Sequence, residues 1–269
     1  MKNLYLKKNF SECIGNTPLI KLKLASEISG CNIYGKCEFL NPGGSVKDRA
    51  AYQIIKDAID EKKISTGGTI VEGTAGNTGI GISLVGNSLG MKSVIVIPKT
   101  QSEEKKQMIR LCGADLKEVD ALPYSNPGNY IRISEKISQE ISNPNGVLWA
   151  NQFDNISNKK SHYLTTGPEI LESLSNNLHG FICSVGTGGT ISGVSDFLKE
   201  KNNDIVIGLA DPFGSAMYNF FKNGKLESSG TSITEGIGQG RITKNLDGVR
   251  IDECFQISDN EALEIVFNM

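Results

Sequence analysis

A lysine at position 47 is the first candidate for covalent chemistry. It follows the turn Asn-Pro-Gly-Gly at 41–44, and Ser45 with Asp48 three residues later forms a capping-box-like start in which Ser45 is the N-cap of a helix. Lys47 would then lie in the first helical turn, where the helix dipole disfavours the ammonium form and favours the neutral amine that attacks carbonyl groups. On spacing alone, the pattern fits a solvated surface lysine better.

Two turns rich in small and hydroxylated residues could bind anions. Residues 72–81 lie between a predicted strand and a predicted helix, so backbone N–H groups at the helix start could receive a carboxylate or a phosphate. A tight turn that lets the helix pack closely on a sheet explains this segment equally well. Residues 186–190, Gly-Thr-Gly-Gly-Thr, occupy the same position after another strand. Their three glycines exceed what a turn requires, which favours anion binding.

A further glycine-rich segment, residues 232–241, ends at Arg241. It could close over an anionic substrate or be an ordinary surface loop.

The sequence contains neither Gly-x-Gly-x-x-Gly nor a P-loop, which weakens dinucleotide and NTPase interpretations. Two histidines and six isolated cysteines form neither a triad nor a metal-binding pattern, so we expect no metal site. We interpret His162 and His179 as structural or surface residues.

The elements that must position these turns alternate between strands and helices. The predicted strands are 69–72, 93–97, 181–185 and 204–210, and the predicted helices are 77–89, 103–112 and 191–199. Ser102 is a suitable N-cap for the helix at 103–112, and Gly113 is suitable just after its end. This alternation predicts an α/β protein with a mostly parallel sheet. We place a domain boundary near residue 150.

The composition excludes several classes of partner. The 269 residues carry 28 Lys plus Arg against 30 Asp plus Glu, a formal charge of −2, so we expect no nucleic-acid partner. No apolar run approaches the roughly 18 residues that a bilayer span needs, so we expect no membrane partner. The first eight residues include lysines but no apolar core or cleavage pattern behind them. We therefore expect a cytoplasmic protein.

In this order, the motifs resemble those of the cysteine synthase (O-acetylserine sulfhydrylase) family, pyridoxal-phosphate enzymes of fold type II. The matching segments cover nearly the whole chain and are 14–19, 41–49, 72–79, 165–169, 186–190, 210–212 and 234–238. The resemblance implies a tryptophan synthase β-like fold with two domains, each a mostly parallel twisted sheet flanked by helices. Residues 1–34 would form an N-terminal arm and part of the larger domain, 35–150 the smaller mobile domain with the Schiff-base lysine, and 151–269 the rest of the larger domain with the phosphate loop.

The resemblance also implies roles for single residues. Lys47 matches the lysine that holds pyridoxal 5′-phosphate as a Schiff base and moves protons at the substrate α-carbon. Asn77 matches the asparagine that hydrogen-bonds the ring hydroxyl. The phosphate loop would be Gly186, Thr187, Gly188, Gly189 and Thr190. The substrate-binding positions would be Thr74, Ala75, Gly76, Thr78, Gln152 and Gly236, although the family often has serine where Ala75 stands.

The implied reaction is a β-replacement in which O-acetyl-L-serine loses acetate and sulfide adds at the β-carbon to give L-cysteine. Two alternatives stay open: a related β-replacement of the cystathionine β-synthase type, and a non-catalytic remnant that binds the cofactor or a partner. The second arises because family members continue past the equivalent of 261–263 into a segment whose serine hydrogen-bonds the pyridine nitrogen, whereas this sequence stops at Met269. We therefore expect a chain shortened at its C-terminus. The resemblance also implies a homodimer and, in some members, binding of the C-terminal tail of serine acetyltransferase.

Overall fold

The computed structural model describes residues 6–268. Residues 1–5, part of the segment in which no secretory signal is visible, and residue 269 lie outside the described residues. The chain divides into two compact units. The first comprises the described part of Met1–Gly15 with Glu38–Asn158, and the second comprises Asn16–Cys37 with the described part of Lys159–Met269. Each unit is therefore assembled from two separate stretches of the chain.

The first unit is built on a parallel sheet with the strand order β5-β4-β3-β6. These strands are β3 (Thr69–Gly73), β4 (Lys92–Pro98), β5 (Asp115–Val119) and β6 (Val147–Trp149). Ile70 of the inner strand β3 pairs with Ser93 on one side and Leu148 on the other. Every residue of β3 is buried, as expected for an inner parallel strand whose two faces are covered by helices.

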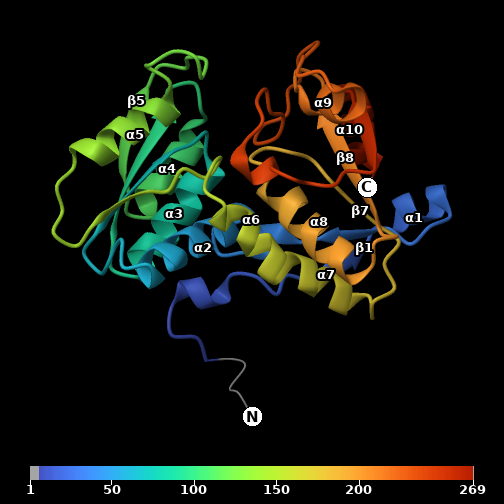
Figure 1. The fold of residues 1–269 in the computed structure, drawn as a ribbon, viewed down its shortest axis with the longest axis horizontal. Helices are drawn as coiled ribbons and strands as arrows, with labels where there is room; N and C mark the ends of the chain where they lie inside the picture. Colours follow the sequence, from blue (N-terminus) through green and yellow to red (C-terminus); the bar gives the residue numbers. More distant parts are fainter. Residues whose placement is uncertain (1–5, 269) are drawn as a thin grey trace. The chain divides into compact units, whose positions relative to one another are not determined.

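Helices cover both faces of this sheet (Figure 1). They are α2 (Lys47–Asp60), α3 (Asn77–Ser88), α4 (Glu103–Leu111) and α5 (Tyr130–Glu140), with 3₁₀ turns at Phe10–Cys13 and Glu38–Leu40. A Cβ on Gly73 would meet Tyr130 O of α5 at 2.6 Å, whereas one on Gly86 of α3 would meet Ile70 Cδ1 at 3.1 Å. Because side chains alternate along a strand, α5 and α3 lie on opposite faces of β3, and Glu72 shares the α3 face with Ile70.

The second unit contains a parallel sheet in the order β7-β8-β9 and a separate antiparallel pair, β1 with β2. Its strands are β1 (Leu19–Lys21), β2 (Tyr34–Lys36), β7 (Gly180–Cys183), β8 (Val206–Pro212) and β9 (Glu253–Ile257). Its helices are α1 (Lys23–Ser29), α7 (Gly167–Ser173), α8 (Gly189–Lys201), α9 (Met217–Asn223), α10 (Asp259–Asn268) and a 3₁₀ turn at Lys244–Leu246. The chain enters this unit through α6 (Ser157–Ser161) and a π-helical turn at His162–Thr166.

The predicted α/β fold with mostly parallel sheets is confirmed. The β-α-β unit predicted at 69–97 is β3-α3-β4, and the predicted cap Ser102 accepts a hydrogen bond from Lys105 N. No helix in the described part of the chain is both long and apolar enough to span a bilayer.

The unit borders differ from the domain borders expected from the sequence. The chain leaves the first unit after Asn158 rather than near residue 150, because Asn158 Nδ2 donates to Gln152 O at 2.9 Å and Ser157 Oγ donates to Asp57 Oδ2 at 2.7 Å. Residues 6–15 also belong to the first unit, where Gly15 N donates to Asn41 Oδ1 at 2.9 Å.

Candidate active site

Lys47 is the first residue of α2 and is half-buried in the first unit. The prediction that Ser45 is the N-cap was wrong, because the helix begins later and Val46 is its N-cap. Ser45 Oγ instead accepts a hydrogen bond from Lys47 N at 3.2 Å. Asp48 does not complete a capping box with Ser45, since its Oδ2 accepts from Gly43 N at 2.5 Å. The turn that precedes Lys47 is therefore held by two hydrogen bonds, one to Ser45 Oγ and one to Asp48 Oδ2.

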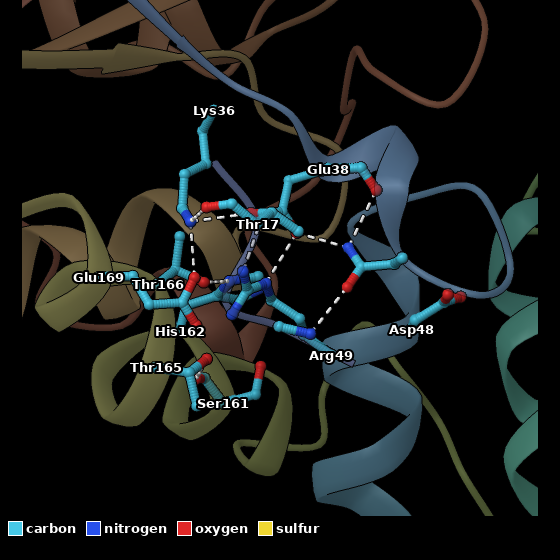
Figure 2. Close-up of polar contacts among 12 residues, drawn as sticks. Thr17, Lys36, Glu38, Asp48, Arg49, Ser161, His162, Thr165, Thr166 and Glu169 are labelled. Atoms are coloured by element: carbon cyan, nitrogen blue, oxygen red, sulfur yellow. Dashed lines mark hydrogen bonds and ion pairs between the residues drawn. The ribbon is translucent and has the colours of Figure 1, made fainter. Parts of the chain in front are cut away.

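The carboxyl group next to the lysine is buried. Burial raises the pKa of Asp48 to about 6, with a smaller contribution from Glu38, while the hydrogen bond from Gly43 opposes the rise. A Cβ on Gly43 would overlap Asp48 Oδ1, so the second residue of the Pro-Gly-Gly turn must be small. Arg49 extends the same helix turn and binds Glu38 with both Nε and an Nη, at 2.7 and 2.9 Å (Figure 2). These contacts fix the backbone on either side of Lys47.

The second predicted turn, Thr74–Thr78, joins the end of β3 to the start of α3. Gly76 has φ +152° and donates its N–H to Thr74 Oγ1 at 3.1 Å. Thr74, Gly76 and Thr78 are buried, whereas Ala75 and Asn77 are exposed. The first N–H groups of α3 lack intrahelical acceptors, which makes this turn suitable for a carboxylate.

Gln152 lies in the same unit and bonds to this turn. Its Oε1 accepts a hydrogen bond from Thr78 Oγ1 at 2.6 Å, and its Nε2 donates to Glu72 Oε1 at 3.1 Å. Glu72 is buried, at 1% exposure. Burial raises its pKa to about 8, against the opposing effect of hydrogen bonds from Gln152 and Asn151. The sequence interpretation missed Glu72, although an acidic residue inside a buried strand was a visible signal.

The predicted phosphate loop, residues 186–190, lies in the second unit between β7 and α8. Gly188 has φ +85°, and a Cβ there would lie 2.5 Å from Leu246 Cγ. A Cβ on Gly186 would lie 2.6 Å from Gly236 O, so the loop at 232–241 packs directly on the phosphate loop. Gln239 Nε2 reinforces this contact by donating to Gly186 O at 3.1 Å. The structure thus places Gly236, predicted to be a substrate-binding residue, beside the predicted phosphate loop.

His162 supports the last residue of this loop. It is buried at 2% exposure, with Nδ1 2.9 Å from Thr166 Oγ1 and Nε2 3.2 Å from Thr190 Oγ1. The structural role predicted for His162 therefore includes a contact with a proposed phosphate-binding residue. His179, by contrast, is exposed.

Residues 16–17 and Glu169, which belong to two further matching segments (14–19 and 165–169), meet in the second unit around a partly buried ion pair. Lys36 Nζ lies 2.6 Å from Glu169 Oε2 and 2.8 Å from Thr17 Oγ1 (Figure 2). Glu169 Oε1 also accepts from Asn16 N at 3.0 Å. Removing one partner of a largely desolvated, hydrogen-bonded pair leaves an uncompensated charge, so this cluster ties residues 16–36 to α7.

The structure therefore sorts the predicted residues into two sets. Lys47, Asn77, Gln152 and the Thr74–Thr78 turn belong to the first unit, whereas the 186–190 loop and Gly236 belong to the second. Within the described residues, no group of three or more His, Cys, Asp or Glu side chains could hold a metal ion.

Comparison with known proteins identifies the family. Residues 10–267 match the family of pyridoxal-phosphate-dependent enzymes, and the chain belongs to that family. It is 48% identical to "Cysteine synthase 1" of Neurospora crassa over 97% of this chain and 70% of that protein. It is 37% identical to the "O-acetylserine dependent cystathionine beta-synthase" of Bacillus subtilis, over 96% of this chain and 80% of that protein.

A solved structure shows the same fold. The crystal structure of the O-acetylserine-dependent cystathionine β-synthase from Helicobacter pylori superposes with a TM-score of 0.83 at 33% identity. The match covers 96% of this chain and 81% of the Helicobacter pylori chain. The fold is therefore that of a fold type II pyridoxal-phosphate enzyme.

The residues present fit the cofactor that this family uses. The loop at 186–190 is a close-packed backbone cradle at the N-terminus of α8, a helix of 13 residues, and such a terminus favours a phosphate dianion. Threonine hydroxyls at 187 and 190 add hydrogen-bonding groups. Lys47 supplies a primary amine of the kind that binds an aldehyde. The donor set therefore matches the phosphate and the aldehyde of pyridoxal phosphate.

Replacing Gly188 by alanine is expected to destabilise the second unit and weaken phosphate binding. A left-handed φ costs a residue with a Cβ about 1–2 kcal/mol, and overlap with Leu246 adds about 1–3 kcal/mol. Gly248 is the matched control, since it has φ +71° and no atom lies within 4 Å of the position that a Cβ would take there. Gly248→Ala should therefore show the backbone cost alone. Urea unfolding of both variants measures the difference, and equal losses would contradict the close packing of the loop.

Proposed function

We propose that this protein catalyses the pyridoxal-phosphate-dependent β-replacement of O-acetyl-L-serine by sulfide, releasing L-cysteine and acetate. The observation that carries the proposal is the position of Lys47, at the start of α2 and in the same unit as the Thr74–Thr78 turn. An amine and a carboxylate-binding turn are the two groups that amino-acid chemistry at the α-carbon requires. The 48% identity to a protein called cysteine synthase selects this reaction within the family.

Each set of residues has a defined task in the proposal. Lys47 binds the cofactor, removes the α-proton of the substrate as a free amine and later returns it. Asn77 binds the ring hydroxyl, and the Thr74–Thr78 turn with Gln152 receives the substrate carboxylate. The loop at 186–190 binds the phosphate, and Gly236 lines the mouth of the site. When bound, pyridoxal phosphate supplies an electron sink for the negative charge at the α-carbon.

The test is to load the purified chain with pyridoxal phosphate, add O-acetyl-L-serine and sulfide, and quantify cysteine and acetate together. We expect the two products in equal amounts, because the bond to acetate breaks once for each carbon–sulfur bond that forms. Acetate without cysteine would mean that water or elimination replaces sulfide addition. Neither product from cofactor-loaded protein would refute the proposal.

A second candidate is cystathionine formation, with homocysteine as the acceptor. It is supported by the 37% identity to an O-acetylserine-dependent cystathionine β-synthase and by the similarity to the solved structure of another. Both reactions use the same first half, so only the acceptor separates them. Measuring kcat/KM for sulfide, thiosulfate and homocysteine with O-acetyl-L-serine held constant identifies the acceptor that this chain prefers.

The proposal extends to assembly and location. We propose a homodimer that can bind the C-terminal tail of serine acetyltransferase, in keeping with the family resemblance. Light scattering of the purified chain measures its mass, and titration with a tail peptide measures binding. We also propose a cytoplasmic location, which the six free cysteines support. Fractionation of cells that express the protein tests this location.

A further inference from the structure

A buried acid stands behind the carboxylate-binding turn and is used by none of the steps above. Glu72 is the fourth residue of β3 and is 1% exposed. It lies on the face of the strand that α3 covers, one residue before Gly73 and two before Thr74. Burying a carboxyl group is unfavourable unless its oxygens are hydrogen-bonded. The hydrogen-bond partners of Glu72 therefore indicate its role in the fold.

Both oxygens of Glu72 accept hydrogen bonds from Gln152, and the backbone of Asn151 also donates to this carboxyl group. Oε1 accepts from Gln152 Nε2 at 3.1 Å, and Oε2 accepts from Gln152 N at 3.4 Å. The backbone of Gln152 is fixed again at its carbonyl oxygen, which accepts from Asn158 Nδ2 at 2.9 Å. Gln152 itself is 3% exposed. Glu72 thus holds both the main chain and the side chain of Gln152.

The orientation of the Gln152 amide decides what reaches Thr78. An amide has a donor end and an acceptor end, and the acceptor oxygen of Glu72 selects the donor end. The acceptor end, Oε1, then faces α3, where it accepts a hydrogen bond from Thr78 Oγ1 at 2.6 Å. In the arrangement observed, the Gln152 amide donates to Glu72 Oε1 and accepts from Thr78 Oγ1, so one side chain links the strand to the helix.

This arrangement closes the turn from both ends. Glu72 precedes the turn at the end of β3, and Thr78 follows it in the first turn of α3. The Gln152 side chain bridges them, so the two ends of residues 73–77 are joined through one amide. Binding groups held in the shape that a ligand needs pay less ordering entropy when the ligand arrives. The backbone N–H groups of the turn are therefore pre-oriented.

We propose that Glu72 is a positioning residue that, by orienting the Gln152 amide, sets the Thr74–Thr78 turn in the shape that receives the α-carboxylate of the amino-acid substrate. The inference rests on the proposed function, since it assigns the turn to that carboxylate. It requires the reach of the side chain and an acceptor oxygen at its end, and it does not require a charge. A glutamine at 72 keeps the reach and one acceptor oxygen for Gln152 Nε2, although its NH2 cannot accept from Gln152 N. An aspartate keeps the acid and loses the reach.

The test compares binding of L-serine with binding of 2-aminoethanol, which is serine without its carboxylate. Each is titrated into pyridoxal-phosphate-loaded protein, and the visible absorbance change gives an equilibrium affinity without turnover. The variants are Glu72→Gln, Glu72→Asp and Glu72→Ala. Glu140→Gln is the control, because Glu140 lies on α5 with 61% of its side chain exposed.

We expect Glu72→Asp and Glu72→Ala to lower the preference for L-serine by about tenfold, the size of effect that follows when a buried polar group loses its partner. Affinity for 2-aminoethanol should be unchanged. Glu72→Gln should keep the preference within about threefold of wild type. In turnover, the same pattern should appear in KM for O-acetyl-L-serine and not in kcat.

The outcomes separate this inference from the proposed function. If the wild-type protein does not prefer L-serine to 2-aminoethanol, the turn is not a carboxylate site and the proposed function fails. If the wild type shows the preference and Glu72→Asp keeps it, Glu72 does not position the turn and the inference is overturned. A Glu72→Gln protein that folds but loses the preference would also overturn it. Glu72→Asp and Glu72→Gln carry the test even where Glu72→Ala does not fold.

Discussion

Lys47→Ala should lower the rate of cysteine formation by about a thousandfold, within the range of 10²–10⁴ that a positioned proton-transfer group typically contributes. The variant should also lose the visible absorbance band of lysine-bound pyridoxal phosphate. Lys47 is half-buried at the start of α2 and not in the core, so its removal should leave the fold intact. The measurements are the absorbance spectrum and the initial rate on one protein sample, with the unfolding midpoint recorded alongside.

Lys56→Ala is the matched control for Lys47→Ala. Lys56 lies on the same helix, pairs with Asp60 at 2.5 Å and keeps 46% of its side chain exposed. Its amine should make no contribution to the band or to the rate, because it is exposed and paired with Asp60. Removing an exposed pair of this kind should also change stability little. A Lys47→Ala protein with a wild-type spectrum would assign the covalent role to another lysine. Loss of the band in both variants would indicate a helix defect and not a lost amine.

The α/β alternation could be predicted from the sequence because its signals are local and strong. The buried strand at 69–73 and the strand at 92–98 flank a helix that begins at Asn77. Short runs rich in β-branched residues and bounded by Gly or Pro indicate strands, and the longer segment between them indicates a helix. The glycines of the 186–190 loop were also a local signal, because their number exceeds what a turn needs and so predicted a specialised loop. The structure gives the reason: Cβ atoms at 186 and 188 would overlap neighbouring chain segments.

Contacts distant in sequence could not be predicted in the same way. Residues 16–36 join the second unit through Lys36 and Glu169, which are 133 positions apart. No local pattern encodes such a pair. The same holds for His162 and Thr190, whose contact depends on how α8 approaches the π-helical turn. The start of α2 was misplaced for a related reason, since the capping box is a local signal and the carboxylate of Asp48 binds Gly43 instead.

The sequence around Glu72 indicates a buried polar contact but does not show which residue makes that contact. A glutamate between valine and glycine in an otherwise apolar strand marks a buried polar contact. Its partner, Gln152, is 80 positions away, and the sequence assigned Gln152 to the substrate through family resemblance. Only the structure joins the two, through the hydrogen bond from Gln152 Nε2 to Glu72 Oε1.

The pH dependence of stability should show how deeply Glu72 is buried. Its pKa rises from 4.5 to about 8 on folding, chiefly through loss of hydration. The folded state therefore holds its proton more tightly than the unfolded state. The stability associated with that proton is fully present below pH 4.5 and is lost as the pH rises to about 8. Each pKa unit corresponds to about 1.4 kcal/mol, so the loss is on the order of 5 kcal/mol across this interval.

Glu72→Gln removes this titration while keeping one acceptor oxygen for Gln152 Nε2. The unfolding free energy of the wild type should therefore fall relative to that of Glu72→Gln as the pH rises from 4.5 to 8. Asp48, whose pKa also rises on burial, is present in both proteins and cancels in the difference. Urea unfolding at several pH values measures the two curves, with Glu140→Gln expected to run parallel to wild type. Parallel curves for wild type and Glu72→Gln would mean that water or a cation reaches Glu72 in solution, and the amide of Gln152 would then face a charged carboxylate at neutral pH.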